Sequence, residues 1–157
     1  MPIDVGAPAP DFTLKDQHNQ PVTLTDFRSR KAVLLVFYPL TFTGTCRAEL
    51  SEIRDHLPDY QNDHVQVLAV SVDSTYSHRV WADQEGYDFP LLADFWPHGE
   101  VARAYGVFNP QAGFADRGTF LIDSAGLIRY AERHGPDDRR DQHPWRTALA
   151  QLTAPTT

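Results

Sequence analysis

The chain has 157 residues, of which 41% are hydrophobic, and its 14 basic against 21 acidic residues give a formal charge of −7. A chain of this length and apolar content can bury one continuous core without disulfides or a structural metal. The negative charge, with no basic run longer than two residues, excludes the basic surface by which proteins bind nucleic acids.

The N-terminal residues have neither the charged nor the apolar region of a secretory signal peptide. The longest apolar run, residues 32–38, is far too short to cross a bilayer. No repeat or low-complexity segment divides the chain, and only residues 153–157 have a tail-like composition. We therefore expect a cytoplasmic protein without a membrane partner, built as a single domain over residues 1–157.

The first half of the chain predicts a hairpin followed by two buried strands. Residues 12–14 and 22–24 alternate apolar and polar side chains around the turn-rich residues 16–20, which is typical of a small hairpin. Residues 32–38 and 65–72 are continuous apolar and β-branched runs. Such runs are typical of strands covered on both faces of a sheet.

A helix that carries the single cysteine follows the first buried strand. Cys46, Leu50, Ile53 and Leu57 fall at offsets of zero, four, seven and eleven, so they form one stripe of a helix that ends before Pro58. Cys46 therefore begins the buried face of this helix.

The second half predicts three more helices, at residues 76–85, 100–105 and 144–152, and a hairpin of strands at residues 119–123 and 127–130. Counted from residue 32 and without the short helix at residues 100–105, the order is β-α-β-α-β-β-α, which predicts an α/β protein of the thioredoxin-like type. We expect a central mixed sheet flanked by helices, with an N-terminal β-hairpin extension.

One cysteine excludes an intramolecular disulfide and a cysteine-rich zinc site, which leaves core packing, a reactive thiol or an intermolecular cross-link. Cys46 opens a helix, where unpaired backbone N–H groups and the helix dipole stabilise a thiolate. Thr43 can place its hydroxyl beside the sulfur or a peroxide, and Pro39 can shield the thiolate from water. The same helix face is apolar, so an inert buried cysteine is an alternative.

Residues 39–46 match the Pro-x-x-x-Thr-x-x-Cys signature of peroxiredoxins at all three fixed positions. The resemblance also covers residues 6–12 and 117–123. Within this family the chain most resembles the one-cysteine alkyl hydroperoxide reductase E group of actinobacteria. The segments that carry this finer resemblance are residues 94–99, 105–109 and 139–142.

The resemblance implies a thiol-dependent peroxidase for hydrogen peroxide and organic hydroperoxides, with Cys46 as the nucleophile that becomes a sulfenic acid. It implies that Thr43 orients the peroxide, that Pro39 shields the thiolate, and that Arg117 holds the thiolate and polarises the peroxide. It also implies that Glu49 pairs with this arginine. Without the resemblance, Arg117 would be expected on the surface, and Glu49 would be a partner of the helix dipole.

Because no second cysteine is present, an external thiol or redoxin must reduce the sulfenic acid. The resemblance implies mycothiol with a mycoredoxin, or thioredoxin, as the reductant, no bound cofactor or metal, and a homodimer. An aromatic surface formed by Phe42, Trp81 and Phe108 would receive an alkyl group or a second subunit. Ordinary core packing of these rings is the alternative.

Other functions fit the sequence less well. A thioredoxin-type reductase needs Cys-x-x-Cys, whereas position 49 is glutamate. A cysteine hydrolase needs a histidine base, and none of the seven histidines has a matching local signature. No two histidines have the i, i+4 spacing of a helical metal site. A non-catalytic thioredoxin-fold binding or chaperone-like module with a structural cysteine is the remaining alternative.

Overall fold

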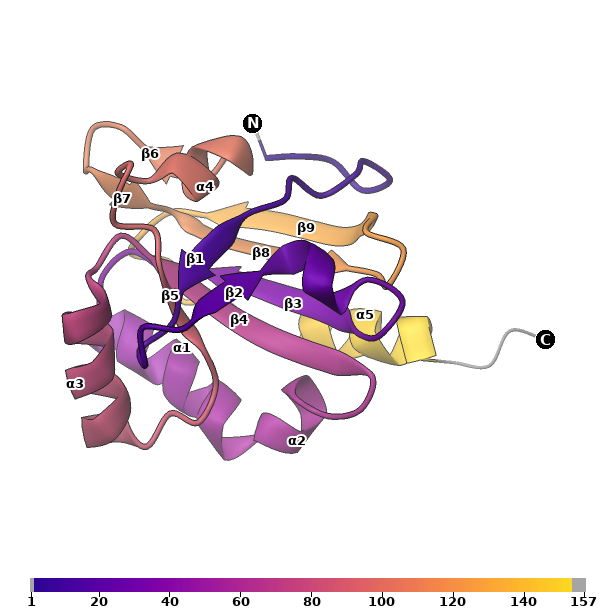
Figure 1. The fold of residues 1–157 in the computed structure, drawn as a ribbon, viewed down its shortest axis with the longest axis horizontal. Coiled ribbons are helices and arrows are strands. Elements are labelled where there is room, and N and C mark those ends of the chain that lie inside the picture. The colour runs from indigo at the N-terminus through magenta and orange to yellow at the C-terminus, as the bar shows by residue number, and fades with distance from the viewer. Residues whose placement is uncertain (1, 154–157) are drawn as a thin grey trace.

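The structure, a computed structural model, describes residues 2–153. Met1 and residues 154–157, which belong to the predicted domain and tail, lie outside the described residues. A five-stranded sheet with the order β5-β4-β3-β8-β9 runs through the centre of the molecule (Figure 1). Its strands are β3 (Ala32–Phe37), β4 (Val65–Ser71), β5 (Leu91–Ala93), β8 (Arg117–Ile122) and β9 (Ile128–His134).

The sheet is mixed, as predicted. β3 pairs in parallel with β4, and β4 with β5, whereas β8 runs antiparallel to both β3 and β9. The two predicted apolar runs form β3 and β4, and β3 lies in the middle of the sheet. The predicted α/β architecture is therefore confirmed.

Side chains of β3 alternate between two hydrophobic layers, because successive residues of a strand point to opposite faces. Val33, Leu35 and Phe37 belong to one layer of the core. Leu34 and Val36 belong to the other layer, which also contains Cys46. The cysteine thus lies between the sheet and one layer of helices.

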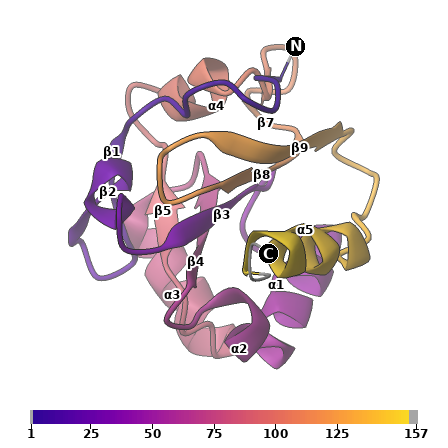
Figure 2. The ribbon, with the colours of Figure 1, turned by 90° about the vertical axis from the view of Figure 1, so that its right-hand side faces the viewer.

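Different elements cover the two faces of the central sheet (Figure 2). On the cysteine side lie α1 (Gly44–Asp55), α2 (Leu57–Tyr60), α3 (Thr75–Glu85) and α5 (His143–Thr153). On the other face lie β1 (Thr13–Lys15), β2 (Pro21–Thr23), the 3-10 helix η1 (Leu24–Phe27) and α4 (Glu100–Ala104). No helix within residues 2–153 has both the length and the apolar character needed to cross a membrane.

The predicted N-terminal hairpin is confirmed as the antiparallel pair β1-β2. The cysteine helix begins at Gly44, two residues earlier than predicted, and ends before Pro58 as predicted. Pro58 instead lies in the first turn of α2, where proline is tolerated because its missing N–H has no helical partner. The sequence pattern did not predict this short helix.

Four other short elements were also missed, one of which is the 3-10 helix η1 after the N-terminal hairpin. β5 follows Pro90 and has only three residues, too few to show a periodic pattern. The hairpin of β6 (Phe108–Asn109) and β7 (Phe114–Ala115) is shorter still. Arg117, predicted to precede a strand, is the first residue of β8, because it pairs with His134 of a longer β9.

Gly118 is the position in β8 where the chain has no room for a side chain. A Cβ atom there would lie 2.7 Å from Cγ1 of Val107. We expect Gly118→Ala to lower the free energy of unfolding by about 1–3 kcal/mol, the usual effect of overpacking. Urea unfolding measures this change. Gly44→Ala is the control, because a Cβ at Gly44 meets no atom within 4 Å; equal stability of the two variants would contradict the prediction.

Candidate active site

Cys46 is the third residue of α1, and a loop of residues 39–43 connects this helix to β3. Its side chain is fully buried against the sheet, in the layer that contains Val36, Tyr38 and Leu50. The helix start therefore brings the thiol to the end of β3, at the edge of the sheet where the parallel strands β3 and β4 both terminate.

The first turn of α1 leaves its backbone donors open. Thr43 is the N-cap residue, but its side chain makes no capping hydrogen bond. Its Oγ1 donates instead to the carbonyl oxygen of Leu40 at 2.8 Å, while its own carbonyl accepts the N–H of Arg47. The N–H groups of Gly44, Thr45 and Cys46 precede that first helical bond and have no partner within the helix. Such a group of donors stabilises an anion.

The loop before the helix is tightly constrained. Phe42 has a φ of +70° although it is not a glycine. This conformation costs on the order of 1–3 kcal/mol and persists only where the surroundings impose it. The Phe42 ring lies 6.1 Å from the Trp81 ring, and Pro39 and Thr41 are buried.

A chain of polar side chains fastens this loop to the end of β4. The N–H of Thr41 donates to Oδ2 of Asp73 at 2.9 Å, and the hydroxyl of Ser71 donates to the same oxygen at 2.7 Å. The hydroxyls of Tyr38 and Thr41 are 3.0 Å apart, and Ser71 also contacts Nε2 of His78. Burial lowers the pKa of His78 to about 4, against the opposing charge of Asp73, so this imidazole is neutral at pH 7.

Glu49, three residues after Cys46 in α1, forms a buried ionic network with two arginines. Nη1 of Arg117 donates to Oε1 of Glu49 at 2.6 Å. Arg140 binds both carboxylate oxygens, through Nη2 at 2.8 Å and Nε at 2.9 Å. The exposed fractions of these side chains are 2% for Arg117 and 0% for Glu49 and Arg140. Because Glu49 lies three residues after Cys46, the network borders the cysteine side of α1.

The charge state of Glu49 follows from its partners. Burial raises the pKa of its carboxyl, but the hydrogen bonds and charge of Arg140, with the charge of Arg117, outweigh burial and lower the pKa below its ordinary value. The carboxylate is therefore ionised at neutral pH. Two cations surround one anion, so the network has one positive charge that Glu49 does not balance.

Arg140 and Gln142, in the segment after β9, make further hydrogen bonds around Glu49. The backbone N–H of Arg140 donates to Oε2 of Glu49, and Nη1 of Arg140 donates to the carbonyl of Gly118. The side chain of Gln142 donates to the backbone carbonyl of Glu49 at 2.9 Å and accepts from the Tyr60 hydroxyl. These contacts fix α1 to the segment that follows β9.

The structure joins Glu49 and Arg117 in a buried ion pair, with Cys46 three residues before Glu49 in α1, and places Pro39 and Thr43 on the loop that leads to Cys46. The alternative of a surface position for Arg117 is wrong, because the side chain is buried. Arg140 was missed as a network residue. Its segment had supported the family resemblance, but no local pattern links it to Glu49, 91 positions away in the sequence.

The proposed aromatic surface is not formed as a unit. The Phe42 and Trp81 rings are neighbours, and Trp81 is fully buried, as ordinary core packing predicts. Phe108 belongs to the hydrophobic layer on the opposite face, where Arg103 lies 3.9 Å above its ring. Of these three rings, only that of Phe42, in the loop of residues 39–43, is exposed.

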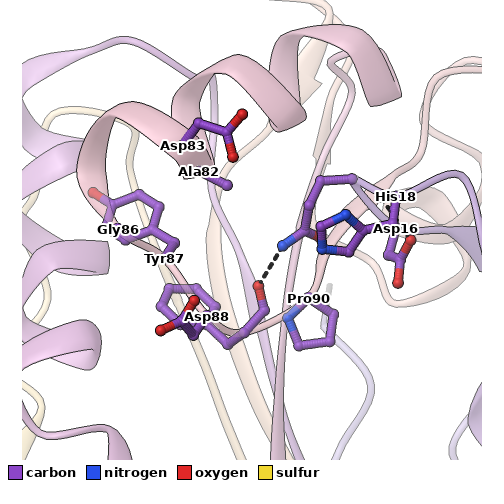
Figure 3. Close-up of a pocket in the computed structure, with 10 residues that line it drawn as sticks. Asp16, His18, Ala82, Asp83, Gly86, Tyr87, Asp88 and Pro90 are labelled. Carbon is purple, nitrogen blue, oxygen red and sulfur yellow. Dashed lines mark hydrogen bonds between the residues drawn. The ribbon is translucent and has the colours of Figure 1, made fainter.

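A cavity of about 350 Å³ lies away from these residues, between the β1-β2 connection and the C-terminal end of α3 (Figure 3). Asp16, His18, Asp83 and Asp88 contribute to its lining, and a hydrogen bond from Gln17 to the Phe89 carbonyl crosses it. None of the predicted catalytic residues lines it. Within residues 2–153, no cluster of three or more histidine, cysteine or acidic side chains has the arrangement of a metal site.

We expect Glu49→Gln to lower the free energy of unfolding at pH 7 by roughly 3–5 kcal/mol, because it leaves two buried arginines without a counter-charge. The pKa of Glu49 is lower in the folded protein than its ordinary value of 4.5, so the ionised carboxylate stabilises the fold at pH values above 4.5. This stabilisation is lost as the pH falls through the pKa of the folded state. The difference from wild type should therefore shrink below pH 4.5.

Guanidinium unfolding at several pH values measures this difference. Glu52→Gln is the control on the same helix, because Glu52 pairs with Arg139 and Arg146 at the surface. Such pairs contribute less than about 1 kcal/mol. A constant difference between wild type and Glu49→Gln at all pH values would contradict the assignment.

Comparison with known proteins gives the same family that the cysteine motif indicates. Residues 5–131 match the AhpC/TSA family. The chain is 58% identical over 152 residues to alkyl hydroperoxide reductase E of Mycobacterium tuberculosis, which covers 97% of this chain and 99% of that protein. It is 39% identical over 135 residues to peroxiredoxin-2 of Rattus norvegicus, with 80% of this chain and 67% of that protein covered.

Solved structures show the same fold. The structure of AhpC from Enterococcus faecalis matches with a TM-score of 0.84 and 29% identity over 94% of this chain and 90% of that chain. Peroxidoxin BcpB from Mycobacterium tuberculosis matches with a TM-score of 0.82 and 28% identity over 99% of both chains. The thioredoxin-like fold is thus confirmed, and the chain belongs to the AhpC/TSA family, the peroxiredoxins.

Proposed function

We propose that this protein reduces hydrogen peroxide and organic hydroperoxides through Cys46 alone. The observation that carries the proposal is the position of Cys46, in the first turn of α1 and three residues before Glu49, which lies in a buried network with one unbalanced positive charge. In proteins, helix starts and nearby cations favour the thiolate, which is the nucleophilic form of cysteine. The sequence contains no second cysteine that could form a disulfide with it.

In the reaction, the thiolate attacks the terminal oxygen of the hydroperoxide along the O–O bond. A sulfur–oxygen bond forms, the O–O bond breaks, and the leaving oxygen takes a proton and departs as alcohol or water. The cysteine is oxidised to a sulfenic acid while the peroxide is reduced. Negative charge moves from sulfur to the leaving oxygen, so donors fixed around both oxygens accelerate the step.

Thr43 orients the hydroperoxide in this proposal. A hydroxyl has one donor hydrogen and two acceptor lone pairs, and that hydrogen is donated to the Leu40 carbonyl. Thr43 therefore offers a lone pair to the O–H of the peroxide. The buried ring of Pro39 limits the access of water, and Arg117, held by Glu49, stabilises the developing charge.

Recycling of the enzyme requires an external reductant. One thiol condenses with the sulfenic acid, which forms a mixed disulfide and releases water, and a second thiol then releases the reduced Cys46. We propose mycothiol with a mycoredoxin, or thioredoxin, as this reductant, on the basis of the 58% identity to a mycobacterial alkyl hydroperoxide reductase E. No bound cofactor takes part.

Mixing of the reduced protein with hydrogen peroxide tests the proposal. We expect a tryptophan fluorescence change at a rate at least roughly a hundredfold above that of a free thiol, because several fixed donors act together. The buried Trp81 lies in the same layer as Cys46 and provides the signal. Dimedone and mass spectrometry should identify a sulfenic acid at Cys46.

Cys46→Ser is the control and should give neither the fluorescence change nor the dimedone adduct. A wild-type reaction no faster than that of a free thiol would contradict the proposal. It would favour the alternative, a non-catalytic thioredoxin-fold binding or chaperone-like module in which Cys46 only packs the core.

We also propose that two copies of the chain form a homodimer through an aromatic patch, defined as Tyr76, Phe95 and Trp96. Tyr76 and Trp96 are 82% and 80% exposed. The three side chains line one surface hollow of about 630 Å³. Contiguous exposed aromatic groups of this kind are typical of protein–protein contacts, and a twofold axis lets one patch cover its copy.

The double variant Tyr76→Glu, Trp96→Glu should be a monomer, because each subunit would bring two buried like charges to the contact. Light scattering coupled to size-exclusion chromatography measures the mass. Val5→Glu is the control, since Val5 is also exposed but lies outside the patch. A monomeric wild type, or a dimeric double variant, would contradict this proposal.

A further inference from the structure

The loop of residues 39–43 carries two of the groups that the proposed reaction needs, Pro39 and Thr43. Between them, Phe42 adopts a left-handed backbone conformation that a side chain other than glycine rarely takes. Such a residue relaxes to another conformation unless its neighbours prevent it. The position of Thr43 relative to Cys46 therefore depends on what holds the residue before Phe42.

That residue, Thr41, is held by Asp73. Oδ2 of Asp73 accepts the backbone N–H of Thr41 at 2.9 Å. Asp73 follows β4, whereas the loop follows β3, so this bond joins the ends of two adjacent parallel strands. A hydrogen bond from a backbone N–H to a carboxylate is charge-assisted and stronger than a neutral one.

Asp73 is itself held by Ser71, which in turn contacts His78. The hydroxyl of Ser71 donates its single hydrogen to Oδ2 of Asp73, so its contact with Nε2 of His78 must use a lone pair of Ser71. The neutral imidazole thus carries its hydrogen on Nε2, a tautomer assigned from the hydrogen bonds. His78 lies in α3 and is fully buried. The orientation of the carboxylate is therefore set by α3 and β4, which belong to the rigid core.

We propose that Asp73 is a positioning residue of the peroxidase, which holds the strained loop of residues 39–43 so that Thr43 meets the peroxide bound at Cys46. This inference rests on the proposed function of Cys46 and Thr43. Asp73 acts through the loop and touches neither the sulfur nor the peroxide. When its bond to Thr41 is lost, Phe42 relaxes, Thr43 moves away from the sulfur, and the cover over Cys46 loosens.

Two rates measured on the same proteins test the proposal. The first is oxidation of Cys46 by hydrogen peroxide, which needs Thr43 in place. The second is alkylation of Cys46 by iodoacetamide, in which the sulfur displaces iodide and no oriented hydroxyl is needed. Asp73→Ala should slow oxidation by about ten- to a hundredfold, the scale on which small displacements of positioning groups act. It should accelerate alkylation, because the buried thiol becomes more accessible.

Two further variants separate the hydrogen bond from other effects. Asp73→Asn removes the charge but keeps an oxygen that can accept the same two bonds, so it should regain most of the oxidation rate. Asp11→Ala removes a carboxylate that binds another threonine N–H, that of Thr25 in η1, and should react as wild type does. Near-ultraviolet circular dichroism must show that each variant is folded at the assay temperature.

The outcomes are distinct. An unchanged ratio of the two rates in folded Asp73→Ala, beside a fast wild type, would overturn the positioning role alone. Equal rates in Asp73→Asn and Asp73→Ala would overturn it too, because charge would then be the cause. A wild type as slow as a free thiol would overturn the proposed function together with this inference.

If Asp73→Ala does not fold, Ser71→Ala replaces it. This variant removes one of the two hydrogen bonds that orient the carboxylate and leaves the bond to Thr41 possible. It should shift both rates in the same directions by a smaller factor. An unchanged ratio of the rates in Ser71→Ala would overturn the proposal.

Discussion

The buried carboxylate of Glu49 is the interaction on which the rest of the site depends. Glu49 lies on α1, Arg117 begins β8, and Arg140 follows β9, so a single side chain joins three elements. Removal of one charge from such a group leaves the others buried and unpaired, which is far more destabilising than the loss of a surface ion pair. The two arginines around one acid also leave the network with one positive charge that Glu49 does not balance.

The site is constrained from two sides by different chemistry. Ionic contacts hold the helix side through Glu49, whereas neutral and charge-assisted hydrogen bonds hold the loop side through Thr41 and Asp73. Between these supports, Cys46 is packed against apolar groups of the sheet. The arrangement keeps the sulfur in place while its nearest backbone donors have no helical partner, as the proposed role of Cys46 requires.

Much of this fold follows from local patterns in the sequence. The apolar runs of β3 and β4 and the helical stripe that starts at Cys46 show their own periodicity, and the motif of residues 39–46 indicates the chemistry. β5 and α2 escaped prediction because three or four residues are too few for a period. Arg140 and Asp73 escaped because their partners are 91 and 32 positions away, and only the folded chain brings them together.

The late position of Arg140 and Gln142 has a consequence for synthesis of the chain on the ribosome. Glu49 and Cys46 emerge early, but Arg117 comes 68 residues after Glu49, and Arg140 and Gln142 come 91 and 93 residues after it. Since the N-terminal parts of a chain emerge first, α1 leaves the ribosome before Arg140 and Gln142 have been made. The buried network around Glu49 is thus completed only when the last strand and the segment that follows it have joined the sheet.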